Sequence, residues 1–222
     1  MTTRLMTDLL FLDIETAPNP AMEPYIPEPE ASSNYKDSAK IAVYVAEKRQ
    51  AAIERMALDV DFAQIKAIGL AIGLDAEPEV WINHHVDGER DDLVRLWAMI
   101  APPSPAPLPC ICGYNALGFD MPIIIRRSFA LGVQPGRVLD LRRYGTCDVL
   151  DLMQVFYHWG QAPGVQARGL KAAARMFGIP NPLPDLDGSK VSTMDDDTLR
   201  AYCANDVRMT QELARRMQGV YF

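Results

Sequence analysis

The stretch Leu9–Thr16, with the sequence LLFLDIET, decides how the rest of the chain is interpreted. It begins with a short apolar run, which is typical of a β-strand that is buried on both faces. Asp13 and Glu15 stand two residues apart, so in a strand their side chains leave the same face. A charge in a buried strand is costly unless it is paired or binds a metal ion. Glu15 alone reads as a strand-end acid that faces water, but the two acids together favour a functional pair.

Outward from this stretch, the sequence predicts an α/β protein. A hairpin of two strands comes next and later strands alternate with helices, which predicts a central mixed five-stranded sheet flanked by helices. Prolines between residues 18 and 29 exclude regular structure until about residue 34. The segment 36–58 is a surface helix or a helix pair. We expect the strands at 9–14, 64–73, 79–84, 110–115 and 147–150, and further helices at 91–100, 121–131, 151–159, 169–177 and 195–217.

Length and composition predict one domain, 1–222. Of the 222 residues, 49% are hydrophobic and 23% are charged, as in an ordinary globular protein. A Pro-rich and helical insert at about 18–60 has too little apolar sequence for a core of its own. No run reaches the roughly 18 apolar residues that a membrane helix needs. Asp8 and Asp13 interrupt the N-terminal apolar stretch, which argues against a secretion signal. We therefore expect a cytoplasmic protein with no membrane partner.

The charge balance limits the classes of function that the chain can have. The chain has 22 Lys and Arg against 29 Asp and Glu, which gives a formal net charge of −7. This argues against a passive, high-affinity coat for nucleic acid, for which a basic surface is expected. It does not exclude an enzyme that acts on nucleic acid, because bound divalent cations supply positive charge locally. The cysteines, Cys110, Cys112, Cys147 and Cys203, lack the spacing of a zinc site and are predicted to be buried thiols.

Two further motifs carry acids in informative places. Asp120 ends GYNALGFD and precedes Met-Pro at the start of an apolar helix, so it is either a helix cap or a functional acid. Tyr202 and Asp206 stand four apart in YCAND, on one face of the last helix. Taken alone, they form an ordinary half-buried pair. The acids at 195–197 match the start of that helix, where negative charge complements the dipole, and are not expected to bind metal.

FLDIET, GYNALGFD and YCAND, in this order, resemble the three motifs of the DEDD superfamily of 3′-5′ exonucleases. The Tyr-x-x-x-Asp form of the third motif resembles the tyrosine branch, and the histidines, His84, His85 and His158, lie away from the position that the histidine branch requires. Within the tyrosine branch, the chain is most similar to stand-alone exonucleases related to the proofreading domain of family B DNA polymerases. The resemblance extends to GLKAAARMFGIP and DGSKV and covers nearly the whole chain.

The resemblance implies a ribonuclease H-like fold and two divalent metal ions, Mg²⁺ or Mn²⁺. Two cations about 4 Å apart activate the attacking water and stabilise the leaving oxygen, and holding them requires several converging carboxylates. By the family's pattern, Asp13 bridges both ions and Glu15 and Asp206 complete the site of the ion that activates the nucleophile. Asp120 holds the other ion, partly through water. Tyr202 orients the attacking water and is not a general base, because an ordinary phenol stays protonated at neutral pH.

Residues near these motifs are candidates for binding the substrate. The resemblance assigns substrate contacts to Asn115 and Phe119 and to backbone groups of Thr16 and Ala17, although a core aromatic is an equal interpretation of Phe119. Five arginines follow the second motif in the sequence. Either they track the phosphates of an incoming strand or they form a solvated face. These arginines are Arg126, Arg127, Arg137, Arg142 and Arg143.

These observations predict a metal-dependent 3′-5′ exonuclease that hydrolyses single-stranded nucleic acid to nucleoside 5′-monophosphates. The expected substrate is the 3′ end of DNA, with RNA as the alternative. Because no polymerase region accompanies the motifs, the enzyme is expected to act in repair or nucleotide recycling, or in proofreading with replication or repair proteins in trans. The alternative from another class is a catalytically silent nucleic-acid-binding or scaffolding module. Intact acids at all four positions argue against that module, because clustered negative charge repels phosphates.

Overall fold

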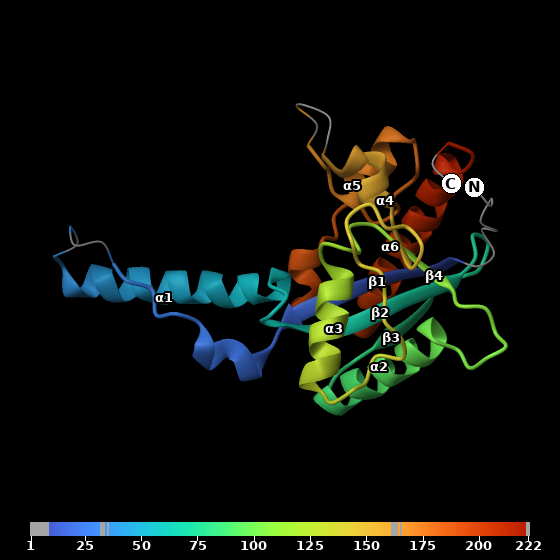
Figure 1. Cartoon of the computed structure of the whole chain (residues 1–222). Coiled ribbons are helices and arrows are strands. Elements are labelled where there is room, and N and C mark those ends of the chain that lie inside the picture. Colours follow the sequence, from blue (N-terminus) through green and yellow to red (C-terminus); the bar gives the residue numbers. More distant parts are fainter. Residues whose placement is uncertain (1–8, 32–33, 35, 161–163, 165, 221–222) are drawn as a thin grey trace.

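A five-stranded sheet forms the centre of the computed structural model, which describes residues 9–31, 34, 36–160, 164 and 166–220 (Figure 1). The strand order is β3-β2-β1-β4-β5, with β1 antiparallel to β2 and parallel to β4. This arrangement confirms the predicted mixed sheet. The strands are β1 (Leu9–Pro18), β2 (Ala63–Ile72), β3 (Glu79–Ile82), β4 (Cys110–Gly113) and β5 (Val149–Asp151).

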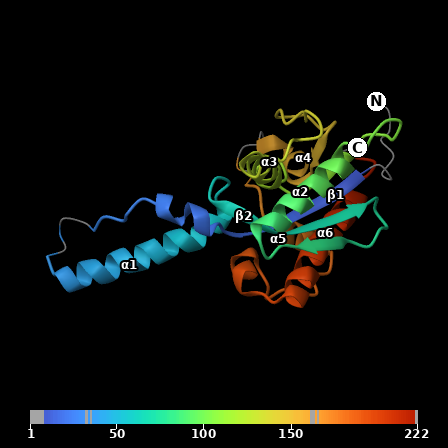
Figure 2. The same cartoon turned by 90° about the horizontal axis from the view of Figure 1, so that it is seen from below.

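Helices cover both faces of the sheet (Figure 2). One face carries α2 (Val86–Ile100) and α3 (Asp120–Ala130), and the other carries α4 (Leu152–Phe156), α5 (Leu170–Met176) and α6 (Asp196–Met217). Leu10, Leu12 and Ile14 of β1 pack into the core under α2 and α3, whereas Leu9 and Phe11 pack into the core under α6. The alternation of a strand therefore directs Asp13 and Glu15 toward the face that α6 covers.

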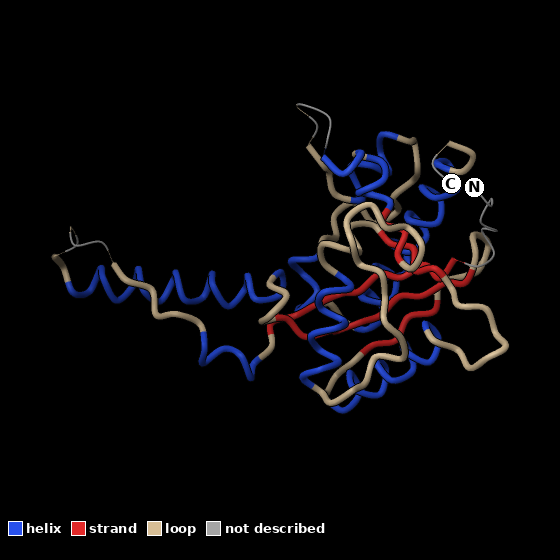
Figure 3. The backbone as a smooth tube through the Cα atoms, viewed as in Figure 1, coloured by secondary structure: helices blue, strands red, loops and turns tan. Residues whose placement is uncertain are grey.

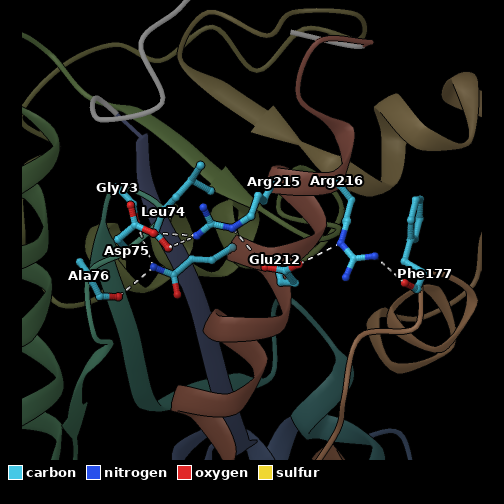
Figure 4. Close-up of polar contacts among 9 residues, drawn as sticks. Gly73, Leu74, Asp75, Ala76, Phe177, Glu212, Arg215 and Arg216 are labelled. Carbon is cyan, nitrogen blue, oxygen red and sulfur yellow. Dashed lines mark hydrogen bonds and ion pairs between the residues drawn. The ribbon is translucent and has the colours of Figure 1, made fainter.

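A cap stabilises the first turn of α6, and polar contacts at its other end hold the helix in place. Asp195 caps its first turn by accepting a hydrogen bond from the Thr198 N–H at 2.8 Å, and two more acids lie in that turn, as predicted. At the other end, Arg215 pairs with Asp75 in the turn between β2 and β3 at 2.8 Å, and Arg216 donates to the carbonyl of Phe177 at 2.9 Å (Figure 4). The helix that carries Tyr202 and Asp206 is thereby fixed against two other segments.

The insert forms an arm. It consists of the 3₁₀ helix η2 (Pro20–Tyr25), α1 (Ser38–Arg55) and the short 3₁₀ helix η3 (Met56–Leu58). The prediction of no regular structure before residue 34 is wrong, because β1 continues to Pro18 and η2 follows. Asn19 explains why η2 forms. Its side chain accepts a hydrogen bond from the Ala21 N–H and caps the helix, which starts with Pro20.

Other boundaries differ because of a distant ion pair or of the local backbone conformation. The helix predicted at 91–100 begins at Val86, where Glu89 enters the first turn and pairs with Arg127 of α3. The helix predicted at 151–159 is α4, which ends at Phe156, because His158 and Trp159 are both left-handed, with φ of 50° and 52°. The strand predicted at 110–115 ends at Gly113, just before left-handed Asn115. Figure 3 shows the long stretch between α3 and β5 as mostly loop, as predicted.

Three of the four cysteines, Cys110, Cys112 and Cys203, are buried as predicted, but Cys147 is exposed. It belongs to the loop that precedes β5, outside the core. Among the described residues, no helix is both long enough and apolar enough to cross a bilayer.

A glycine of β2 allows α6 to approach the sheet. A Cβ atom at Gly69 would lie 2.7 Å from the Sγ of Cys203 and 2.9 Å from a methyl group of Val207. Gly69 is the β2 residue that faces Asp13 in the sheet register. We expect Gly69→Ala to lower the free energy of unfolding by about 1–3 kcal/mol, the usual cost of overpacking a core. Urea denaturation measures this, with Gly188→Ala as the control, because Gly188 is exposed and an added Cβ there would have no neighbour within 4 Å. An unchanged midpoint in Gly69→Ala would show that α6 yields without cost.

Candidate active site

Four carboxylates meet near the carboxyl end of β1. Asp13 and Glu15 come from β1 itself, Asp120 from the first residue of α3 and Asp206 from the middle of α6. The sheet pairing leaves this end of β1 accessible to side chains, because β4 pairs with β1 only from Leu9 to Phe11. The structure thus brings together the four acids that the three sequence motifs supply.

Burial and mutual repulsion disfavour negative charge on the two acids of β1. Burial raises the pKa of Asp13 well above its usual range, and Glu15, Asp120 and Asp206 raise it further. The pKa of Glu15 is likewise raised, first by burial and then by Asp206 and Asp120. A group of like charges in a buried place is unstable on its own, so a bound cation would relieve it.

Asp120 is a member of this cluster and not the N-cap of α3, because Phe119 occupies that position and no side chain caps the helix. Helix α3 begins at Asp120, and its Oδ1 accepts a hydrogen bond from the Ile14 N–H of β1 at 3.0 Å. This bond ties the second motif to the residue between Asp13 and Glu15. Burial raises the pKa of Asp120 to about 7, although the Ile14 hydrogen bond opposes the shift. The helix-cap alternative is therefore wrong for this side chain.

Tyr202 and Asp206 face the same cluster from α6, where both are buried. Burial raises the pKa of Asp206 to about 6, and the hydrogen bond from Tyr202 partly offsets that rise. The pKa of Tyr202 is raised well above its usual range by burial and by the charges of Glu15 and Asp206. The phenol is therefore protonated at neutral pH and donates a hydrogen bond to Asp206.

The four acids have a lysine neighbour, to which the sequence analysis assigned no role. Lys171 of α5 lies with its Nζ 4.6 Å from the centre of the Tyr202 ring and donates to the carbonyl of Leu186. Its charge lowers the pKa of both Glu15 and Asp206. The lysine stands in GLKAAARMFGIP, which carried the family resemblance, but a lone lysine in a helix gives no sign of a distant partner.

Asp151 is a second residue without a predicted role, and its carboxylate holds the loop between β4 and α3. Its Oδ1 accepts from the Asn115 N–H at 3.0 Å, and its Oδ2 accepts from the Leu117 N–H at 3.0 Å. The same carboxylate caps α4 by accepting from the N–H groups of Met153 and Gln154. The loop that ends at Asp120 is thus fixed by a buried acid at the end of β5.

The predicted substrate-binding residues line the two segments that carry the acids. Thr16 and Ala17 continue β1 with buried side chains, and the Thr16 hydroxyl donates to the carbonyl of Ala57 at 2.6 Å. Asn115 is half-buried and left-handed, with φ 64°. Phe119 is also half-buried and packs against the core under α2 and α3. Part of the Phe119 ring therefore belongs to the core, and part is accessible to solvent.

The five arginines after the second motif do not form one surface. Arg127 makes a buried, bidentate pair with Glu89 at 2.7 Å, and Arg137 donates to the carbonyl of Pro109. Arg126 pairs with Asp61, Arg142 pairs with Asp140, and Arg143 donates to the carbonyl of Trp159. Arg127 and Arg137 are largely buried, so the five side chains do not form one solvated face. Contact of the exposed Arg126, Arg142 and Arg143 with phosphates stays a prediction.

The chemistry of the donors suits hard divalent cations. Carboxylate oxygens of Asp13 and Glu15 lie within 4.8 Å of each other and of the Cys203 sulfur. Burial and the nearby acids raise the pKa of the Cys203 thiol, so it stays neutral and is a poor ligand. Oxygen ligands with excess negative charge are what Mg²⁺ and Mn²⁺ prefer. The four acids fit such ions, and the thiol does not add to the set.

Comparisons with known proteins agree with this geometry. Residues 61–220 match the model of a family described as predicted 3′-5′ exonucleases related to the exonuclease domain of PolB. The family B DNA polymerase from the hyperthermophilic archaeon Pyrobaculum calidifontis has a similar fold, with a TM-score of 0.56 and 21% identity over 94% of this chain. This likeness confirms the expected ribonuclease H-like fold. The chain spans only 24% of that polymerase.

Exonuclease I of E. coli is a more distant structural neighbour. Its complex with a 5cy-dT13 oligonucleotide gives a TM-score of 0.48 at 13% identity, over 95% of this chain and 40% of that one. A product-bound structure of exonuclease I gives a TM-score of 0.49 at the same identity. No curated protein matches the chain.

Proposed function

Because this chain belongs to the family of predicted 3′-5′ exonucleases related to the exonuclease domain of PolB, we propose that it removes nucleotides from the 3′ end of single-stranded DNA. The observation that carries the proposal is the convergence of Asp13, Glu15, Asp120 and Asp206, whose charges are buried and unbalanced. A module that only binds phosphates has no use for such a cluster, because it repels the ligand.

The four acids would hold two divalent cations, Mg²⁺ or Mn²⁺, with Asp13 shared between them. When bound, such ions would activate water for attack on the terminal phosphodiester and stabilise the charge of the leaving 3′ oxygen. Hydrolysis would break the bond between phosphorus and that 3′ oxygen, so the product is a nucleoside 5′-monophosphate and the shortened strand keeps a 3′ hydroxyl.

Several other side chains would position the substrate. The protonated Tyr202 would donate a hydrogen bond to the attacking water, and its ring is fixed beside Lys171. The accessible part of Phe119 would contact the terminal base or sugar, and Asn115, Thr16 and Ala17 would lie beneath the terminal nucleotides. Asp151 would act as a positioning residue, because it fixes the loop that delivers Asp120.

A cleavage assay tests the proposal. We expect a 5′-labelled single strand to shorten stepwise from its 3′ end with Mn²⁺ or Mg²⁺, with nucleoside 5′-monophosphate as the product and no cleavage in chelator. A strand blocked at its 3′ end is the control and should persist. Tight binding of the strand without cleavage under either metal would instead identify the silent binding module. An RNA strand of the same sequence in parallel decides between the two substrates.

Tyr202→Phe is expected to lower kcat by about 10- to 100-fold, with a smaller effect on KM. The loss corresponds to one hydrogen bond to a reacting polar group, about 1.5–3 kcal/mol. Single-turnover kinetics on a short strand measures it. Tyr157→Phe, which removes a hydroxyl outside the cluster, serves as the control. Equal rates for Tyr202→Phe and the wild type would leave Tyr202 with a packing role alone.

Lys171→Met is expected to move the acidic limb of the pH–rate profile to higher pH. Lys171 lowers the pKa of Glu15 and Asp206, so without its charge both acids keep their protons to a higher pH and lose the ionised form that binds metal. A shift of about 1 unit is typical for the loss of one neighbouring opposite charge. Lys171→Arg keeps the charge and should restore the profile, whereas an unshifted profile in Lys171→Met would contradict this role.

A further inference from the structure

The arm helix α1 stands apart from the rest of the molecule. None of its 18 residues is buried, and both Figure 1 and Figure 2 show it extending away from the sheet. Asp37 caps its first turn, and Arg49 ties it to the other leg of the arm by pairing with Glu28 at 3.0 Å. A single helix of this length is only marginally stable in water. Its exposed surface therefore calls for a function outside the core.

The exposed surface of α1 has a positive net charge, in contrast to the chain as a whole. The helix has four basic residues against two acidic ones, although the formal net charge of the whole chain is −7. Within the described residues, no carboxylate lies within ion-pair distance of Lys40, Lys48 or Arg55. Residues at the spacing of 40, 44, 48 and 55 share one face of a helix. We call Lys40, Tyr44, Lys48 and Arg55 the arm stripe.

The base of the arm adjoins the candidate active site. The Thr16 hydroxyl, one residue after Glu15, donates to the carbonyl of Ala57 just beyond the end of α1. A hollow of about 200 Å³ at this junction is lined by residues of β1, α1 and the 3₁₀ helix η5 (Gly188–Thr193), among them Thr16, Glu54 and Ser189. A strand with its 3′ end at the four acids would therefore begin within reach of the arm.

We propose that the arm stripe binds the phosphates of the substrate strand several nucleotides away from the 3′ end, an inference that rests on the proposed function. The acids at the site repel a polyanion, so cations elsewhere must contribute to holding a long strand. From Lys40 to Arg55 the stripe spans about 22 Å at 1.5 Å per residue, which is long enough for several phosphates. Tyr44 adds an aromatic ring between the two lysines, as in surfaces that bind single strands.

A second copy of the chain is a weaker candidate for the same surface. Two identical stripes would place lysines against lysines, and like charges in contact are repulsive. The exposed apolar side chains of α1 are mainly alanines, with Val43 as the one large member among those that are at least a third exposed. Such small side chains bury little area, so charge complementarity favours a polyanion.

Fluorescence anisotropy with labelled oligothymidylates of about 4 and 20 nucleotides, lengths that bracket typical single-strand sites, tests the proposal. In chelator, so that nothing is cleaved, Lys40→Glu/Lys48→Glu should weaken binding of the long strand by at least about tenfold. It should also lower the slope of log Kd against log salt by about 1.4, as expected for two phosphate contacts. Lys40→Gln/Lys48→Gln should give an intermediate loss, and circular dichroism checks that α1 stays folded.

The matched control is Arg90→Glu/Arg175→Glu, which changes the net charge equally at exposed sites outside the arm. It should leave the ratio of long-strand to short-strand affinity unchanged. Equal affinities of the arm variant and this control would overturn the proposal, and so would a wild-type dimer that the arm variant dissociates in light scattering. The binding assay and the cleavage assay are independent. If the protein never cleaves but the arm variant still loses affinity, the proposed function is refuted and the arm stripe is supported.

Discussion

Asp13→Asn is expected to lower kcat/KM by at least about 10²–10³-fold, the scale for losing one electrostatic stabiliser of a transition state. The asparagine keeps the shape of the side chain and its place on β1 but removes the charge that both cations would share. No other acid can replace it, because Glu15, Asp120 and Asp206 come from fixed positions on β1, α3 and α6. Single-turnover cleavage of a short 5′-labelled strand with saturating Mn²⁺ measures the loss.

The same substitution should stabilise the protein in chelator, which separates a lost charge from a lost fold. Asp13 has a raised pKa in the folded state, so at neutral pH its ionised form opposes folding. The melting temperature of Asp13→Asn in chelator should therefore be higher than that of the wild type. Asp91→Asn, at an exposed site on α2, is the control and should change neither quantity. Near-normal cleavage by Asp13→Asn would remove Asp13 from the site.

Stability without metal is expected to fall as the pH rises from about 4 to about 7, and divalent cations should reverse the trend. Unfolded aspartates lose their protons near pH 4, whereas the folded state keeps protons on Asp206 and Asp120 up to pH values of about 6 and about 7. Across this window the folded state binds more protons than the unfolded one, so the free energy of unfolding decreases with pH.

Metal ions bind the ionised acids, so their stabilising effect should grow over the same window. At about 100 times Kd, one bound ion adds about 2.7 kcal/mol, which corresponds to several degrees in melting temperature. We expect Mn²⁺ to raise the melting temperature far more at pH 8 than at pH 5. Asp120→Asn should flatten the dependence measured in chelator, while Asp61→Asn at the surface should not. An equal Mn²⁺ effect at both pH values would contradict the assignment.

The sequence predicted the sheet from local patterns, whereas two of the four acids, Asp120 and Asp206, were singled out only by the resemblance of the three motifs taken together. The apolar run at Leu9–Leu12 marks a buried strand wherever it lies, and Asp13 and Glu15 follow it in register. One helix boundary failed where a side chain finds a distant partner. Residue 86 starts α2 because Glu89 pairs with Arg127, 38 residues away, and no local pattern contains that contact.

The same limit applies to the site. Lys171 and Asp151 lie far from the motifs in sequence and gain their importance only from the fold, through Tyr202 in one case and the loop before Asp120 in the other. The arginines after the second motif show the reverse. Their sequence proximity suggested one surface, but acids from other elements, such as Asp61 and Glu89, engage two of them separately.

Manganese binding followed by electron paramagnetic resonance tests most directly whether these acids form a metal centre. The signal of free Mn²⁺ disappears on binding, so a titration counts the ions bound by each chain. We predict about two ions per wild-type chain at pH 8, with loss of both in Asp13→Asn and retention of both in Asp91→Asn. Identical titration curves for the wild type and Asp13→Asn would contradict the account, because carboxylates that bind no shared ion cannot support the proposed hydrolysis.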